Sequence, residues 1–313
     1  MSEVLETPRE AGGEWPGLPR LQAAGKVLKA TPDRMARLVP HPAGTPVETL
    51  RKTLVEQGYL WLKGFFDRQA VLDFRGYVFS NFADLGLLQP GSDPKLGLFS
   101  GDPGPKDLAN KRLMELVRSA AFESFCLEPR LWRFMDGFLG GLSYLHKRKL
   151  MRYTLPRTPQ VTPAHYDLVY LRGGTDRIVT AWIPIGDVPV EMGGLVYLEG
   201  SHALGARLEA EFRAANGELS PEERISAYNK HMSEGGWISK DLPDMAEKFD
   251  ARWLVADYEA GDLVLHSPYM IHASTMNEDP ENRIRLSTDI RYQNVRDEID
   301  ARWANHWTLD DML

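Results

Sequence analysis

The segment Thr162–Asp167 places an imidazole and a carboxylate two residues apart, His165 and Asp167. We expect a β-strand here, and because side chains alternate along a strand, His165 and Asp167 would share one face and Tyr166 would point to the other. A histidine and a carboxylate presented together are two of the three ligands of a 2-His-1-carboxylate iron site. Such a site leaves the opposite side of the ion open for other reactants. The pattern predicts a metal centre if a second histidine comes from elsewhere in the chain.

Two downstream histidines are candidates for the third ligand. His266 and His272 have the same parity in the segment 263–274, so both would face the same side of an extended chain. One could bind the metal while the other supports it or faces a substrate. The remaining histidines lie outside the predicted β core, in a turn-like segment or in a predicted helical region: His41, His146, His202, His231 and His306.

The last predicted strand, 283–292, has one polar and one apolar face. Its polar face consists of Arg283, Arg285, Ser287, Asp289 and Arg291. The alternate residues Ile284, Leu286 and Ile290 would pack against helices. A guanidinium on the polar face is suited to hold the carboxylate of an acidic cosubstrate such as 2-oxoglutarate, because arginine stays charged and donates in pairs. The alternative is a salt-bridged edge strand.

Composition excludes several classes of function. The 313 residues include 37 basic and 44 acidic side chains, for a formal net charge of −7, and there is no Lys/Arg-rich run. Nucleic acid and anionic membrane surfaces are therefore not expected partners. The single cysteine, Cys126, excludes an internal disulfide and a thiolate zinc cluster. The first residues lack the pattern of a signal peptide and no apolar run has the length of a membrane span, so we expect a cytoplasmic protein.

Hydrophobic periodicity predicts helices followed by a β domain. We expect a mobile leader over 1–25, helices from 47 to Gly58, from Asp67 to 77 and over 111–139, and a loop-rich section over 83–110. Predicted short strands follow at 147–155, 164–171, 178–185, 193–198, 253–258, 262–267 and 283–292. Regularly spaced short strands are typical of a jelly-roll or cupin-like barrel. We therefore predict one domain, 26–313, that is mainly β with the N-terminal helices packed outside.

The β pattern is interrupted over 204–250. Ser220, Pro221 and Glu223 combine an N-cap, a proline at the first helical position and a capping-box glutamate. We expect a helical insertion in this region, forming part of a wall or lid over the site.

The motifs together resemble the phytanoyl-CoA dioxygenase-like (PhyH-like) family of Fe(II)/2-oxoglutarate oxygenases. The similarity rests on the His-x-Asp pair and on the distant segment His272–Arg283, with serine two residues and arginine eleven residues after the histidine. It extends over about residues 45–293 and includes the segments 58–64, 181–187 and 193–202. The fold that it implies is a double-stranded β-helix.

The resemblance also implies roles for particular residues. His165, Asp167 and His272 would bind Fe(II), and Arg283 with Ser274 would hold the distal carboxylate of 2-oxoglutarate. Trp182, with Lys149 or Met151 on the preceding strand, would line the cosubstrate pocket. The carboxylate at Asp167 disfavours a halogenase, since halogenating relatives carry a small residue there. The expected reaction uses dioxygen and oxidises a C–H bond, with release of succinate and carbon dioxide.

Two other functions fit the pattern less well: a metal-dependent isomerase and a binding module that does not turn over 2-oxoglutarate. The expected substrate is a small metabolite or natural-product intermediate, while the oligomeric state is left open. Aromatic and basic side chains that could meet it are Trp61, Tyr166, Tyr170, Trp237, Tyr269, Arg172, Arg177 and Arg291. Each of them is also compatible with ordinary packing or ion pairing.

Overall fold

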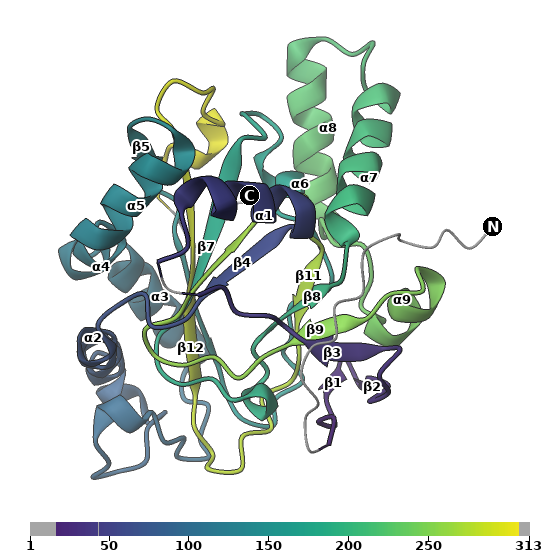
Figure 1. Cartoon of the computed structure of the whole chain (residues 1–313). Coiled ribbons are helices and arrows are strands. Elements are labelled where there is room, and N and C mark those ends of the chain that lie inside the picture. The colour runs from purple at the N-terminus through teal and green to yellow at the C-terminus, as the bar shows by residue number, and fades with distance from the viewer. Residues whose placement is uncertain (1–16, 43, 307–313) are drawn as a thin grey trace.

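Two β-sheets face each other in the computed structural model, which describes residues 17–42 and 44–306 (Figure 1). The larger sheet has the order β4–β10–β7–β12–β5, with β6 also paired to β12. Its strands are β4 (Tyr59–Leu62), β5 (Ser143–Leu145), β6 (Leu150–Thr154), β7 (Ile178–Pro184), β10 (Leu263–His266) and β12 (Arg285–Asn294). The smaller sheet has the order β11–β8–β9–β3 and consists of β3 (Met35–Arg37), β8 (Leu195–Leu198), β9 (Trp253–Val255) and β11 (His272–Ser274). The arrangement agrees with the predicted jelly roll, although the two sheets do not join into a closed barrel.

Helices cover the outer face of the larger sheet (Figure 1). They are α1 (Val47–Gln57), α2 (Arg68–Ser80), α3 (Lys106–Val117), α4 (Ala120–Cys126) and α5 (Pro129–Leu139). The predicted helix over 111–139 is therefore three helices, because Ser119 caps α4 and Glu128 with Pro129 starts α5. Asp67 caps α2 by accepting from the Ala70 amide at 2.8 Å, as its sequence position predicts.

The region 204–250 is helical, as expected. It contains most of α7 (Ser201–Ala215), together with α8 (Pro221–Ser233) and α9 (Leu242–Lys248), and α7 and α8 stand side by side as a hairpin (Figure 1). Both hydrogen bonds of the capping box are present: the Glu223 amide donates to the Ser220 hydroxyl, and Glu223 accepts from the Ser220 amide. The chain thus breaks the β domain between β8 and β9 with one compact helical unit.

The N-terminal part of the described chain is packed from Leu21 onward. Leu21 and Ala23 are each 1% exposed and belong to the core beside the smaller sheet. Ala23 lies in β1 (Gln22–Ala23), which pairs with β2 (Lys26–Val27). Part of the predicted leader thus belongs to the fold, whereas residues 1–16 lie outside the described residues.

The predicted strand over 164–171, which carries His165 and Asp167, is wrong. The segment 164–171 holds only isolated bridges at Ala164 and His165, and the chain then turns into the short helix α6 (Leu168–Leu171). Asp167 has helical dihedrals, φ −65° and ψ −30°, so strand alternation does not relate it to His165. The strands β5 and β11, which sequence periodicity misses, are three residues each.

The space between the sheets has an apolar and a polar part. Inward side chains of both sheets form an apolar cluster that includes Trp61, Trp182, Tyr197, Leu254 and Val264. Inward side chains of β12 continue this layer with charged and hydroxyl groups. In the described part of the chain, no helix is long and apolar enough to cross a membrane.

Candidate metal centre

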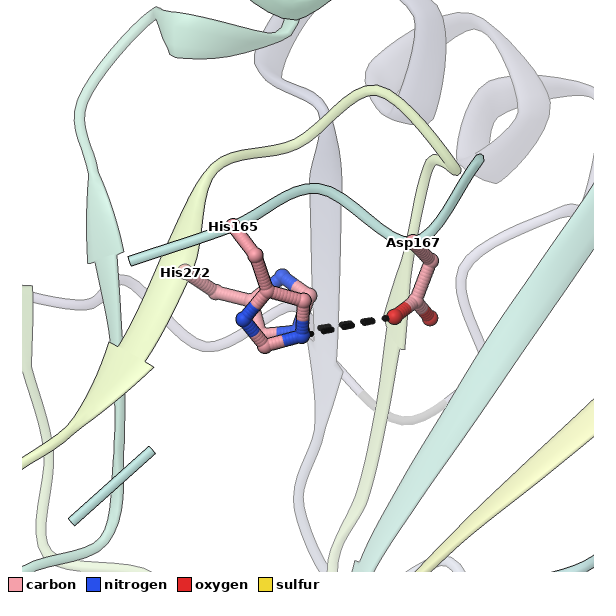
Figure 2. Close-up of side chains that lie close together, drawn as sticks. All are labelled: His165, Asp167 and His272. Carbon is pink, nitrogen blue, oxygen red and sulfur yellow. Dashed lines mark ion pairs between the residues drawn. The ribbon is translucent and has the colours of Figure 1, made fainter. Parts of the chain in front are cut away.

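The two histidines of the predicted triad are brought together by backbone pairing. The amide of His165 donates to the carbonyl of His272 at 3.0 Å, and the amide of His272 donates back at 2.9 Å. This bridge brings the two imidazole rings together (Figure 2), with their centroids 4.3 Å apart. The third ligand therefore comes from β11, on the smaller sheet, next to the segment that carries the first.

Local hydrogen bonds fix the tautomer of both imidazoles. Nδ1 of His165 lies 2.8 Å from the carbonyl of Pro163, and Nδ1 of His272 lies 2.9 Å from the carbonyl of Met270. A carbonyl accepts only, so each Nδ1 carries the proton and each Nε2 keeps its lone pair. Both lone pairs are thus available to one cation.

Asp167 completes the group with one oxygen. Its Oδ1 lies 3.7 Å from Nε2 of His165 and 3.8 Å from Nε2 of His272. The ligand atoms of the three buried residues all lie within 4.8 Å of one another (Figure 2). Oδ2 is occupied separately by the Thr180 hydroxyl and by Nε2 of His266 at 3.3 Å. Oδ1 faces the histidines and also accepts from Nη2 of Arg291 at 3.1 Å, so binding of a metal through this single oxygen fits the geometry.

His266, the competing candidate, faces the same interior but makes different contacts. Its Nε2 donates to Asp167, and its Nδ1 accepts from the Tyr197 hydroxyl at 2.8 Å. Both ring nitrogens of this fully buried histidine are therefore engaged by protein groups. His266 orients the carboxylate, whereas His272 offers a lone pair.

The protonation states suit a cation. Burial lowers the pKa of His165, and burial together with the neighbouring imidazoles of His165 and His266 holds the pKa of His272 well below its ordinary value. Burial by itself would raise the pKa of Asp167, but the Arg291 guanidinium and the hydrogen bond from His266 hold that pKa well below its usual range. Two neutral imidazoles and one carboxylate are the forms that bind a divalent metal.

A small pocket extends from the triad along the inner face of β12. Besides the triad it is lined by Trp182, Leu195, Ser274, Arg285 and Ser287, with Thr162, Ala273, Arg152, Asp289 and Arg291 around them. Arg285 is 4% exposed and donates from Nη1 to the Gly193 carbonyl. Its Nε and the Ser287 hydroxyl have no hydrogen-bond partner within the described residues. Burial lowers the pKa of Arg285 to about 10, which leaves it cationic at neutral pH.

Arg283, the arginine expected at this position, lies elsewhere. Its Nε and Nη2 donate to Asp279 at 3.0 and 2.7 Å, and its Nη1 pairs with Glu281 at 3.3 Å. Arg283 precedes the first residue of β12 and does not line the pocket. Arg285, two residues further on and of the same parity, lies within β12 and lines the pocket, as do Trp182 and Ser274.

The two residues expected on the preceding strand point away from the triad. Lys149 is paired with Glu123 of α4, and Met151 belongs to the core on the helix side. The register of β6 with β12 explains this, because Arg152 is opposite Ser287 and Met151 is opposite Thr288. Arg152, which sequence reasoning missed, shares the inward face and donates to Asp289 at 3.0 Å.

A larger cleft of about 840 Å³ leads from the triad to the surface. It is lined by β6, by residues of the segment 155–163, by side chains of α3, and by Tyr170 and Trp303. None of the described residues of 204–250 lines it. The helical insertion is therefore not a wall of this cleft.

The insertion instead contacts the segment that carries two ligands. Arg172 and Glu209 of α7 form a buried pair at 2.7 Å, with side chains 1% and 2% exposed. The hydroxyl of Tyr166, between His165 and Asp167, donates to Glu209 at 3.1 Å. Nη1 of Arg172 reaches Nδ1 of His231 on α8 at 2.6 Å. This buried network ties both helices of the hairpin to the back of the metal-binding segment.

Known proteins resemble the chain over most of its length. The model of the family described as Phytanoyl-CoA dioxygenase (PhyH) matches residues 98–284. The 1-deoxypentalenic acid 11-beta-hydroxylase of Streptomyces arenae is 25% identical over 254 residues, which are 79% of this chain and 81% of that protein. Its namesake from Streptomyces exfoliatus is 25% identical over 260 residues, again 79% of this chain and 81% of that protein.

Solved structures show the same fold. The epimerase SnoN in complex with Fe3+, alpha ketoglutarate and nogalamycin RO has a TM-score of 0.54 at 18% identity, over 81% of this chain and 85% of that chain. The alpha ketoglutarate dependent carbocyclase SnoK has a TM-score of 0.50 at 18% identity, over 82% and 87% of the two chains. These likenesses confirm the jelly-roll architecture.

Proposed function

The chain belongs to the phytanoyl-CoA dioxygenase (PhyH) family of Fe(II)- and 2-oxoglutarate-dependent oxygenases, and we propose that it hydroxylates, or otherwise oxidises, an unactivated C–H bond of a small molecule. The carrying observation is the buried triad of His165, Asp167 and His272, in a pocket also lined by Arg285, whose Nε has no hydrogen-bond partner within the described residues. When bound, ferrous iron and 2-oxoglutarate supply the activation of dioxygen and the decarboxylation of the cosubstrate to succinate. Everything else in the reaction is positioning by the protein.

His165, Asp167 and His272 would hold the iron on one face. Their Nε2 and Oδ1 atoms are directed to one point, and the hydrogen bonds to Pro163 and Met270 keep both imidazoles in the binding tautomer. The open side of the ion would face the pocket toward Arg285 and the cleft. Three protein ligands and an open side are the arrangement that non-haem iron oxygenases use.

Arg285 and Ser287, in place of Arg283, would hold the distal carboxylate of 2-oxoglutarate. The free Nε of Arg285 and the free hydroxyl of Ser287 are both buried and lie on the same face of β12. A carboxylate would give both donors the acceptor that they lack, and a buried unsatisfied donor is costly. Trp182 and Leu195 would flank the cosubstrate and exclude water, and Ser274 would add a further hydroxyl.

The substrate would be a small molecule with an apolar body. The cleft of about 840 Å³ is the size of a metabolite site, and much of its lining is aliphatic or aromatic. The relatives from Streptomyces are named as hydroxylases of a small organic acid, which supports hydroxylation as the outcome. The presence of Asp167 supports oxygen transfer over halogenation.

The test is spectroscopic and needs no substrate. Anaerobic protein with Fe(II) and 2-oxoglutarate should develop the weak visible charge-transfer band of a chelated 2-oxo acid. His272→Ala should abolish the band. Arg285→Gln should raise the 2-oxoglutarate concentration that gives half of the full band by about tenfold or more, because a charge-assisted hydrogen bond is lost. Arg283→Gln is the matched control and should titrate like the wild type.

Each result has a distinct meaning. A metal-loaded wild type without the band would contradict the oxygenase function and favour a metal-dependent isomerase or a binding module. If Arg283→Gln and not Arg285→Gln weakens the affinity for 2-oxoglutarate, Arg283 would be the residue that binds the distal carboxylate. Succinate release in a substrate screen would then identify what is oxidised.

A further inference from the structure

The inner end of the cleft carries more positive than negative charge. Three arginines line the pocket at the triad, Arg152, Arg285 and Arg291, against two carboxylates, Asp167 and Asp289. Bound Fe(II) and doubly charged 2-oxoglutarate would cancel each other, so one formal positive charge would remain. Lys106 at the cleft is exposed to solvent and does not enter this balance, and no acidic side chain is among the described residues that line the cleft. An excess charge beside an enclosed site needs a counter-ion.

Arg291 is a buried cation whose hydrogen bonds are incomplete. Its side chain is 4% exposed, and Nη2 donates to Oδ1 of Asp167 at 3.1 Å. Its Nε and Nη1 are buried and have no hydrogen-bond partner within the described residues. The guanidinium lies 5.0 Å from the ring centre of Trp303, which also lines the cleft. Two donors of a buried arginine thus lack an acceptor at the boundary between the triad and the cleft.

Arg152 presents a second guanidinium to the same space. Among the described residues, Asp289 accepts from Nε of Arg152 at 3.0 Å, and the Arg152 side chain is 44% exposed. Arg152 and Arg291 line both the inner pocket and the cleft. Arg285 and Arg291 lie six residues apart on β12, about 20 Å along a strand at about 3.4 Å per residue. The cosubstrate at Arg285 would therefore leave the Arg291 end of the site free. Arg152 is opposite Ser287 and lies between the two ends, so its long side chain would have to turn toward Arg291.

We propose that Arg152 and Arg291 form a carboxylate-binding subsite, so that the substrate is a monocarboxylic acid with a hydrocarbon body. This inference rests on the proposed function, because it places the substrate beside the same metal centre. The cleft walls contribute apolar surface through Leu113, Leu150, Leu155, Val161 and Trp303. A planar carboxylate matches the paired donors of a guanidinium, and one negative charge balances the excess that remains after iron and cosubstrate are bound.

A pair of isosteric probes tests the subsite without turnover. Adamantane-1-carboxylate and adamantane-1-carboxamide share a rigid hydrocarbon cage and differ in charge. Their binding to anaerobic protein with Fe(II) and saturating 2-oxoglutarate would be followed by calorimetry. The carboxylate should bind about tenfold tighter or more, as a charge-assisted hydrogen bond provides. Arg152→Gln and Arg291→Gln should each reduce that preference.

Arg177→Gln is the matched control. Arg177 has a 76% exposed side chain, pairs with Asp297 and lines neither the pocket nor the cleft, so this variant should keep the full preference. Because Arg291 is buried, its variant would be checked for native circular dichroism, and the more exposed Arg152 decides the matter if Arg291→Gln does not fold.

Three results would overturn the subsite. Equal affinity of the two probes would remove the charge preference, and a preference that survives the double variant would place the carboxylate on the metal instead. Tighter binding of adamantane-1-phosphonate than of the carboxylate would assign the subsite to phosphorylated substrates. If the charge-transfer band of 2-oxoglutarate does not form, the proposed function itself fails, whereas a band without carboxylate preference contradicts the subsite alone.

Discussion

The two faces of strand β12 are both buried, but they satisfy their polar atoms differently. On the outer face, under the helices, the hydroxyl of Thr288 donates to the Leu150 carbonyl at 2.6 Å and that of Tyr292 donates to the Cys126 carbonyl at 2.7 Å. On the inner face, four polar atoms have no partner within the described residues: Nε of Arg285, Oγ of Ser287, and Nε and Nη1 of Arg291. The outer face is complete as folded, while the inner face has hydrogen-bonding capacity left for ligands.

This difference separates stability from function within one strand. Burial of Leu286, Ile290 and Tyr292 removes apolar surface from water, which is the main favourable term in folding. The charges on the inner face are costly to bury and are only partly compensated by protein groups. Substitutions on the outer face should therefore change the free energy of unfolding, and substitutions on the inner face should change ligand affinity.

The largest effect is expected on the outer face. Ile290→Ala should lower the free energy of unfolding by about 2–5 kcal/mol, because it removes fully buried methyl groups and leaves a cavity. Urea denaturation would measure the loss, and the affinity for 2-oxoglutarate should not change. Val55→Ala, at a side chain that is 76% exposed, is the control and should lie within about 0.5 kcal/mol of wild type. Equal effects of the two variants would refute the role assigned to this face.

His146, beside the C-terminal end of the inner face of β12, should make the free energy of unfolding depend on pH. Burial lowers the pKa of His146 to about 4, and its Nε2 lies 2.8 Å from Oε1 of Gln293 on β12. The unfolded chain binds a proton near pH 6.5 and the folded chain does not, so stability is full above that pH and falls toward pH 4. The loss from this group is about 3 kcal/mol.

His146→Gln removes this titration and keeps a hydrogen-bonding side chain. The variant should show a flatter dependence of the free energy of unfolding on pH between about 6.5 and 4, measured by urea denaturation of metal-free protein. The buried His165 and His272 contribute in the same direction, so some slope will remain. An unchanged slope would mean that His146 does not stay neutral in the folded chain.

A smaller effect is expected from the histidine that orients Asp167. His266→Phe should weaken metal affinity about 10–100-fold, as loss of an outer hydrogen bond to a ligand does, without abolishing binding. Tyr197→Phe removes only the far end of the same relay and should cost less. Competition with a chelator would measure both. Complete loss of metal in His266→Phe would make it a ligand and reverse the assignment of His272.

The smallest effect distinguishes the two faces most sharply. Ser287→Ala removes a hydroxyl that has no partner in the described part of the chain, so the free energy of unfolding should change by less than about 0.5 kcal/mol. The affinity for 2-oxoglutarate should nevertheless fall by about 0.5–1.5 kcal/mol, the worth of one hydrogen bond. A variant that is destabilised but binds normally would contradict the proposed anchor.

Sequence patterns predicted the residues of the triad better than the backbone that presents them. His165, Asp167 and His272 converge as expected, yet Asp167 starts a helix and does not lie on a strand. Helical dihedrals at Asp167 depend on tertiary contacts, such as the hydrogen bond from Thr180 of β7, which no local propensity encodes. Short strands such as β11 lack enough residues to show a period of two.

Register explains what sequence spacing could not supply. The predicted alternation of polar and apolar residues holds within β12 from Arg285 onward, but it does not say which arginine lies deep enough to reach the pocket. Asp279 binds Arg283 outside the pocket, and the sequence alone does not reveal this pairing. The prediction for Lys149 and Met151 chose the wrong face of β6. The pairing of β6 with β12 turns Arg152, one residue away from Met151, toward the pocket.

The buried pair of Arg172 and Glu209 restricts how this enzyme can be recombined with its relatives. A chimera that takes the α7–α8 hairpin from a relative without a carboxylate at the position of Glu209 would leave Arg172 in the interior unpaired, and an uncompensated buried charge costs about 3–5 kcal/mol. Tyr166, between the candidate metal ligands His165 and Asp167, would lose its acceptor in the same step. A working exchange must therefore carry the segment 165–172 together with the hairpin, so the unit of exchange includes part of the metal centre.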